Sequence, residues 1–306
     1  MQKKSFLSKA DLPLLGLALL VLLSAAGFIA FYYADRYLHP DQKVLERQSK
    51  HLEGMVQKNP QNPDLRVATA NYYLDSGKVD LAIEQAEEAL TIDPKHQGAM
   101  ILLGKAYPTK GKSDLAIHYL TQVVELNRDN PMAKADKRIN AVYYHLGVLY
   151  HTQGKYSEAA EALKAALNID YADADSRYML GTVFQKQNNH PAAINEFHQA
   201  LRFDPMYSEP YRGLAVSYAA VGDQPKAAYA RAMILLTQGK YSDAATQLEG
   251  VLQQSPDLAQ VNFGLGIAYE KLGKRDQAIV ALNSFLKIYP NDIAARQALG
   301  RLGQGN

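Results

Sequence analysis

Residues 143–166 read YYHLGVLYHTQGKYSEAAEALKAA, and residues 177–200 repeat the pattern 34 positions later (177 against 143) as RYMLGTVFQKQNNHPAAINEFHQA. Large residues recur at intervals of three and four in each half of the pattern, which predicts two short helices. A fixed period of this length is typical of helical hairpins that stack side by side. We therefore expect an all-α solenoid, whose stacked hairpins offer a surface for holding another molecule.

Small residues stand at matching points of most copies. A Gly after the central Leu of the first helix allows two helices to approach closely, and a later Gly or Asn ends that helix. A Pro near the end of several copies stops the second helix. The first of these positions holds Gly104, Gly147, Gly181 and Gly266, and the second holds Gly77, Gly111, Gly154, Asn188 and Gly273.

This pattern resembles the tetratricopeptide repeat family over roughly residues 60–300. The Trp that usually stands near the start of the first helix is absent, since the chain contains no Trp. The resemblance implies helical hairpins wound into a right-handed superhelix. We place the solenoid at residues 63–302, with about six or seven repeats.

An apolar segment precedes the repeats. Residues 12–33, from Leu12 to Tyr33, carry no charge and would span roughly 33 Å as a helix, which is enough to cross a bilayer. We expect one transmembrane helix there, after a short N-terminal tail at residues 1–11. The alternative is a signal peptide cleaved after Ala26.

The flanking charges predict the orientation of this segment. Lys3, Lys4 and Lys9 lie on the short tail, and close to the membrane this bias favours a cytoplasmic N-terminus. The repeats would then lie outside the cytoplasm, in the periplasm or at the outer face if the source is bacterial. The absence of Cys is compatible with an oxidising compartment.

Residues 34–62 form the juxtamembrane part, with a capping helix expected from Asp41 to Lys58, and residues 303–306 form a tail. Nine extra residues, 131–139, separate the second and third copies. Because Asn130 and Pro131 favour a helix start, we expect one helix from there to Thr152 that projects two turns beyond its neighbours. Its cations are either solvated or form a contact for an acidic partner or lipid headgroups; they are Lys134, Lys137 and Arg138.

A second irregularity lies at residues 222–239. The pattern of a second helix returns half a period late, so the helix from Pro225 to Gln238 must serve as the second helix of one hairpin and the first of the next. Arg231 occupies a position that favours an apolar residue in both registers, which predicts altered geometry or local looseness at this joint.

Catalytic and metal-binding patterns are missing from the sequence. The 8 His residues include no H-E-x-x-H pair, and without Cys no thiolate site can form. The net charge is only +2, and the sequence has no basic stripe with interleaved aromatic residues. Both features argue against nucleic-acid binding. We expect no enzyme activity, no metal and no cofactor.

By the resemblance, the first helices line a concave groove that takes a peptide or helix of a protein partner. The Lys and Asn pattern that clamps chaperone tails is not met, because Val67 and Ala141 stand where Lys would be needed. Four of the expected groove residues are aromatic and form a ladder: Tyr144, Tyr178, Tyr229 and Phe263. These rings either anchor a ligand or pack between neighbouring repeats. The expected groove residues are Asn71, Lys105, Tyr144, Val148, Tyr178, Thr182, Lys186, Arg212, Tyr229 and Phe263.

These features predict a membrane-anchored scaffold that docks a protein partner and assists the assembly of an envelope or membrane complex. The alternative is a glycan-binding subunit of a polysaccharide or cell-wall system, in which the aromatic ladder stacks on sugars.

Overall fold

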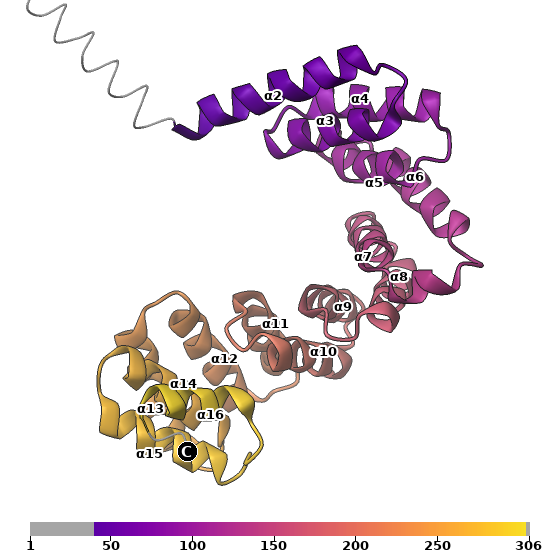
Figure 1. The fold of residues 1–306 in the computed structure, drawn as a ribbon. Helices are drawn as coiled ribbons and strands as arrows, with labels where there is room; N and C mark the ends of the chain where they lie inside the picture. The colour runs from indigo at the N-terminus through magenta and orange to yellow at the C-terminus, as the bar shows by residue number, and fades with distance from the viewer. Residues whose placement is uncertain (1–39, 304–306) are drawn as a thin grey trace, which may run out of the picture. The chain divides into compact units, whose positions relative to one another are not determined.

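The computed structural model describes residues 40–303, and every regular element in this range is helical (Figure 1). The expected membrane helix at residues 12–33 and the tail at residues 1–11 lie outside the described residues. Across residues 40–303, each helix is too short or too polar to span a bilayer. The described chain is thus an all-α array of fifteen α-helices and two short 3-10 helices.

The chain divides into two compact units: the first ends at Ala106, and the second begins at Tyr107. In the first unit, α3 and α4 form a hairpin, α5 packs against both, and α2 packs against α3. Tyr73 donates a hydrogen bond to the Glu53 carboxylate at 2.8 Å, which ties the capping helix α2 to α3. The helices of this unit are α2 (Pro40–Lys58), α3 (Pro63–Asp75), α4 (Val79–Ile92) and α5 (Gln97–Ala106).

In the second unit, each α-helix packs against the next one along the chain. The first helices of successive hairpins also meet, since α9 contacts both α7 and α11. The elements of this unit are η1 (Tyr107–Lys110), α6 (Ser113–Leu126), η2 (Pro131–Ala135), α7 (Lys137–Thr152), α8 (Tyr156–Ile169), α9 (Ala174–Lys186), α10 (His190–Phe203), α11 (Ser208–Ala220), α12 (Gln224–Thr237), α13 (Tyr241–Gln254), α14 (Gln260–Lys271), α15 (Arg275–Leu286) and α16 (Ile293–Arg301).

The turns inside the hairpins use the left-handed backbone conformation. Gly154, between α7 and α8, has φ +74°, a conformation that costs a residue with a Cβ about 1–2 kcal/mol. Asn188 takes the same role between α9 and α10 with φ 57°. The small residue that the sequence places at the end of the first helix is therefore required by the turn.

The Gly after the central Leu is required by helix packing. A Cβ placed on Gly147 would lie 2.5 Å from Cγ of Leu163, far inside normal carbon contact. Gly266 faces Leu282 in the same way, at 2.5 Å. In these two hairpins the helices therefore approach until a large side chain of the second helix rests on the backbone of the first.

The expected long helix at residues 131–152 is wrong. The chain forms η2 at Pro131–Ala135, and then Asp136 starts α7 as a new N-cap whose carboxylate accepts a hydrogen bond from the Arg138 N–H at 2.8 Å. η2 packs back against α8, with Ala133 buried, so the insertion does not project as two extra helical turns. Two successive caps, at Asn130 and Asp136, divide this segment.

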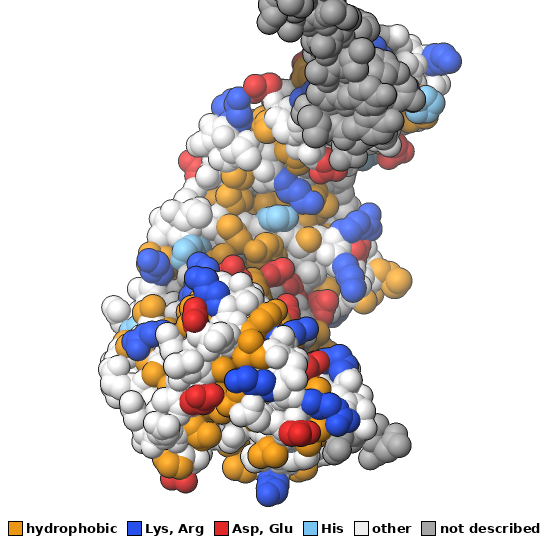
Figure 2. All heavy atoms as spheres, turned by 90° about the vertical axis from the view of Figure 1, so that its left-hand side faces the viewer, with side chains coloured by type: hydrophobic (Ala, Val, Ile, Leu, Met, Phe, Trp, Pro, Cys, Tyr) orange, Lys and Arg blue, Asp and Glu red, His pale blue; other side chains and the backbone are white. Residues whose placement is uncertain are grey.

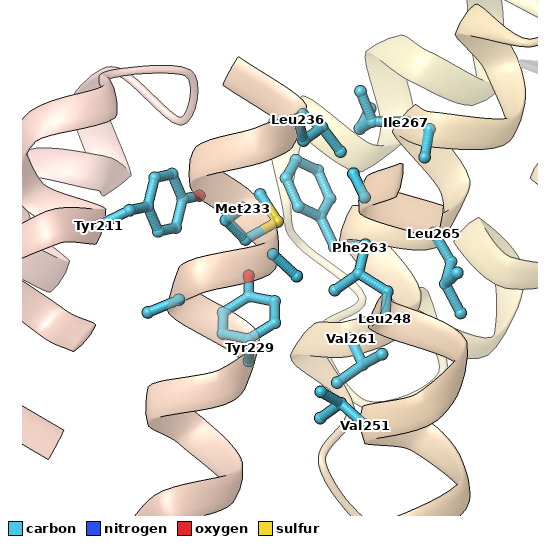
Figure 3. Packing of buried hydrophobic residues seen from close by; sticks show 14 of the residues in the cluster. Tyr211, Tyr229, Met233, Leu236, Leu248, Val251, Val261, Phe263, Leu265 and Ile267 are labelled. Atoms are coloured by element: carbon cyan, nitrogen blue, oxygen red, sulfur yellow. The ribbon is translucent and has the colours of Figure 1, made fainter. Parts of the chain in front are cut away.

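Helix α12 packs against α11, α13 and α14, which is the double role expected from the sequence. Figure 3 shows Met233 and Leu236 of α12 directed toward Phe263 of α14 in a continuous apolar cluster. The expectation that Arg231 replaces an apolar residue is wrong, because its side chain is exposed on the remaining face of the helix. The predicted looseness of this joint stays a prediction.

Candidate functional site

Two of the expected groove residues belong to the first unit. Asn71 of α3 is exposed, and its amide donates to the Val67 carbonyl of its own helix at 3.0 Å. Lys105 of α5 is exposed as well. Each is accessible to a ligand of this unit, but no aromatic ring accompanies them among the expected groove residues.

The second unit brings three tyrosines together, two on successive first helices and one directly before the next first helix. Tyr144 of α7 and Tyr178 of α9 are half-buried, as is Tyr207, which directly precedes α11. The ring centroids of Tyr178 and Tyr207 lie 5.6 Å apart, and Tyr178 also packs against Phe197 of α10 at 6.0 Å. We call Tyr144, Tyr178 and Tyr207 the tyrosine row.

Carboxylates flank the tyrosine row. The Tyr207 hydroxyl donates to Oδ1 of Asp175 at 2.7 Å, and burial together with this hydrogen bond raises the pKa of Tyr207 far above its usual value. Burial also raises the pKa of Tyr144, with a smaller contribution from the charges of Asp175 and Asp173. The Tyr207 hydroxyl therefore keeps its proton and holds the ring against α9 through this hydrogen bond.

Four other expected groove residues lie near the row's helices. Val148 and Thr182 are half-buried, and the Thr182 hydroxyl donates to the Tyr178 carbonyl at 3.1 Å. Lys186 and Arg212 are exposed. The aromatic centre of this surface is thus bordered by both cations and carboxylates.

The sequence did not identify Tyr207, because it lies outside the first helix and has no matched position in the groove pattern. It follows Pro205 in the loop before α11, and its side chain hydrogen-bonds to Asp175 of α9.

Figure 2 shows hydrophobic side chains gathered in a band on one face, with Asp and Glu side chains beside them.

Two of the expected groove residues, Tyr229 and Phe263, are largely buried. Their exposed fractions are 7% and 8%, and both belong to the large apolar cluster around α12. Because α12 packs against helices on several sides, the face that would line a groove in a regular copy is covered here. Both rings thus pack against neighbouring helices, and their contact with a ligand stays a prediction.

Tyr229 and Phe263 nevertheless border a pocket of about 460 Å³, which we call the junction pocket. Its aromatic walls are held by ring contacts, such as Phe263 with Phe285 at 5.4 Å and Tyr211 with Tyr229 at 6.4 Å. Its lining residues come from α10 to α12, from α14 to α16 and from the loops between them; they are His198, Leu201, Arg202, Phe203, Pro205, Tyr211, Tyr229, Gln260, Phe263, Phe285, Asn291, Asp292, Ile293 and Ala294.

Metal-binding geometry is not found in the part of the chain that the structure describes, since no three His, Cys, Asp or Glu side chains gather there. Burial lowers the pKa of His198, with a further contribution from Lys226, and its Nε2 lies 2.6 Å from the Tyr218 hydroxyl. His198 and Tyr218 are thus paired with each other within the fold.

Models of a known repeat family match most of this chain. Models described as "Tetratricopeptide repeat" match residues 73–136, 235–302 and 178–232, and one described as "TPR repeat" matches residues 147–188. Together these matches cover more than half of the 306 residues.

Curated relatives and a solved structure agree with this match. "BBSome complex member BBS4" of Bos taurus is 24% identical over 244 residues, covering 70% of this chain and 45% of that protein. "Cellulose synthase 1 operon protein C" of Komagataeibacter xylinus is 26% identical over 155 residues, covering 50% of this chain and 11% of that protein. The chain therefore spans less than half the length of either relative.

The solved structure is the C-terminal part of a TPR repeat-containing protein from Cytophaga hutchinsonii. It superposes with a TM-score of 0.53 at 18% identity, covering 88% of this chain and 99% of that one. At this identity the likeness shows the fold alone.

Proposed function

The chain belongs to the tetratricopeptide repeat family, and we propose that it is a membrane-anchored scaffold that binds a protein partner through the tyrosine row. The partner would be an extended peptide or a helix lying across α7, α9 and α11. The proposal extends to the assembly of an envelope or membrane complex, in which the scaffold holds one component at the bilayer.

The observation that carries the proposal is the half-burial of three tyrosines on adjacent repeats. Elsewhere in these repeats, large side chains such as Leu163 and Phe197 are fully buried. The rings of the tyrosine row are fixed by their neighbours yet keep part of their surface free. Ordered aromatic anchors give contact area at low entropic cost, which is why they dominate the energetics of many interfaces.

The relatives support the proposal at a coarser level. BBS4 is described as a complex member, which agrees with a scaffold role for a chain of this family. Anchoring through residues 12–33 would confine the search for a partner to the membrane plane, so even a groove of modest affinity could be occupied. We propose a cytoplasmic N-terminus and extracytoplasmic repeats.

The anchor and its orientation have a direct test. Under alkaline carbonate extraction the full chain is expected in the membrane pellet, and N-terminal sequencing of the mature protein should return Met1 or Gln2 rather than Gly27. Protease added outside the cytoplasmic membrane should digest the repeats. Release into the supernatant with an N-terminus at Gly27 would instead establish a cleaved signal peptide.

Docking is tested by crosslinking and affinity purification from native membranes. The variant Tyr144→Ala/Tyr178→Ala is compared with Glu158→Ala/Glu161→Ala, which changes exposed residues of α8. We expect one partner that the wild type and the glutamate variant retain and that the tyrosine variant loses. Equal retention by all three proteins would contradict docking at the tyrosine row.

The second candidate is a glycan-binding role. Half-buried tyrosines beside Asp175 could stack on sugar rings and accept their hydroxyl hydrogens, and one relative belongs to a cellulose synthase operon. Binding of the purified chain to a glycan array, lost in Tyr144→Ala/Tyr178→Ala, would favour this role over protein docking.

A further inference from the structure

The junction pocket exists because the repeat period breaks at α12. A regular stack would continue the row of first helices from α11 to the first helix of the next hairpin. Here α12 takes that place: it packs against α11 as the second helix of one hairpin and against α14 as the first helix of the next. The C-terminal end of α10 and the start of α16 then face a common space beside Tyr229 and Phe263.

The interior of the pocket is shaped for an apolar side chain. Phe263 and Phe285 form an aromatic wall, with their ring centroids 5.4 Å apart. Ile293, which also lines the pocket, is 71% exposed and adds apolar surface that a ligand can reach. A volume of about 460 Å³ lies within the range of sites that hold small ligands or a few side chains.

The charge at the mouth is unbalanced. Arg202 lines the pocket, and within residues 40–303 its guanidinium makes no hydrogen bond or ion pair. By contrast Arg177, on the neighbouring helix α9, pairs with Glu196 at 3.0 Å. A free guanidinium beside an apolar cavity favours a carboxylate, which it can bind through two parallel hydrogen bonds.

The one carboxylate that lines the pocket is already engaged. Asp292 is the N-cap of α16, and its Oδ1 accepts a hydrogen bond from the Ala295 N–H at 2.8 Å. The positive end of the α16 dipole offsets the charge of this residue. Arg202 is therefore the charged group of the mouth that has no partner.

We propose that the junction pocket binds a peptide segment in which a large apolar side chain, such as Phe, adjoins an acidic residue. The apolar side chain enters between Tyr229, Phe263 and Phe285, and the carboxylate pairs with Arg202. The junction pocket is separate from the tyrosine row, since none of the three tyrosines of the row lines the pocket. The scaffold would thus hold a second segment, either of the same partner or of another one.

The test uses the full chain in lipid nanodiscs and peptides with an acetylated N-terminus and an amidated C-terminus. The Asp side chain is then the only carboxylate of the peptide. The probe is acetyl-Gly-Phe-Asp-Gly-amide, compared with versions carrying Phe→Ala, Asp→Asn or Asp→Lys. Isothermal titration at low salt should give the tightest binding for the probe. A hydrogen-bonded charge pair predicts roughly tenfold weaker binding for Asp→Asn, and larger losses for Asp→Lys and Phe→Ala.

The variant Arg202→Gln should remove the difference between the Asp and Asn peptides while leaving the affinity of the Asn peptide unchanged. The matched control is Arg212→Gln, because Arg212 is also exposed and lies on α11 outside the pocket. It should keep the tenfold difference, as should Tyr178→Ala, which disables the proposed groove without touching this site.

Equal affinity for the Asp, Asn and Lys peptides would overturn the proposal, as would an absence of binding in a wild-type chain whose circular dichroism melt is intact. Loss of the Asp preference in Arg212→Gln rather than in Arg202→Gln would place the site elsewhere. None of these results bears on the tyrosine row, which the crosslinking comparison tests separately.

Discussion

Gly213 lies at a point where one added methyl group should disrupt the packing of two repeats. It stands in the middle of α11, and a Cβ at this position would lie 2.3 Å from Cζ and 2.4 Å from Cε2 of Phe197. Phe197 is fully buried, and its ring also rests on Gly181, where a Cβ would lie 2.6 Å from Cε1. The ring therefore cannot leave one helix by moving toward the other.

We expect Gly213→Ala to destabilise the protein by about 1–2 kcal/mol. Overpacking a core by one methyl group costs about 1–3 kcal/mol, and with the ring confined on two sides the upper half of this range applies. Against this, Ala is favoured over Gly inside a helix by about 1 kcal/mol. In urea, with a slope near 3 kcal/mol per M, the midpoint should fall by roughly 0.5 M.

The control is Gly250→Ala in α13, where no atom lies within 4 Å of the added Cβ. This variant gains helix propensity without a clash, so its urea midpoint should rise. A second comparison replaces Phe197 by Leu, which is the residue at the matching positions 163 and 282. In that background Gly213→Ala should cost at least 1 kcal/mol less than in the wild type.

The reasoning would be refuted if Gly213→Ala were as stable as Gly250→Ala. If Gly213→Ala lowered the free energy of unfolding equally in the wild type and in Phe197→Leu, the added methyl group would not clash with the Phe197 ring.

Three further predictions concern single positions. Asn188→Gly should raise stability by up to about 1 kcal/mol, because Asn188 has φ 57° in its turn, and a lower urea midpoint would count against this. Arg177→Met should cost about 2 kcal/mol in urea unfolding, since Arg177 pairs with Glu196 in a largely buried position; a change below 0.5 kcal/mol would mean that the pair contributes nothing net. Burial and the charge of Lys226 lower the pKa of His198, so the folded state binds a proton there less readily than the unfolded state. The free energy of unfolding should therefore keep the full contribution of neutral His198 above pH 6.5 and fall as the pH decreases below that value. His198→Gln should flatten this decline between pH 7 and 5 in thermal unfolding, and an unchanged profile would assign it to other groups.

The regular copies could be predicted closely from the sequence because their packing is local. The spacing of Gly147 and Leu163 follows directly from the contact between the two helices of one hairpin. The left-handed turns are likewise set by single residues such as Gly154. The capping helix α2 ends at Lys58, where the sequence placed its end.

The errors lie where a copy departs from the period. Tyr229 and Phe263 occupy groove positions by sequence spacing, but both are largely buried in the apolar cluster that α12 shares with its neighbours. Spacing within one repeat carries no information about which later helix fills that space. The segment before α7 departs from the sequence prediction for a simpler reason, since the Asp136 side chain caps a new helix there.

The residues that complete the two candidate sites come from loops and from distant repeats. Tyr207 reaches Asp175 from the loop before α11, and Arg202 shares its pocket with Ile293, more than ninety residues away in sequence (202 against 293). Only the course of the stack determines such neighbours. A repeat pattern alone therefore predicts the architecture better than the site.

Photo-crosslinking from single positions is the strongest test of our proposal that a protein partner lies on the tyrosine row. A benzophenone amino acid at position 182, beside Tyr178 on α9, should capture one defined polypeptide in native membranes. The same group at position 161, on the exposed face of α8, should capture none. Capture of the same polypeptide from position 161 and not from 182 would contradict the account and move the interface to the second helices.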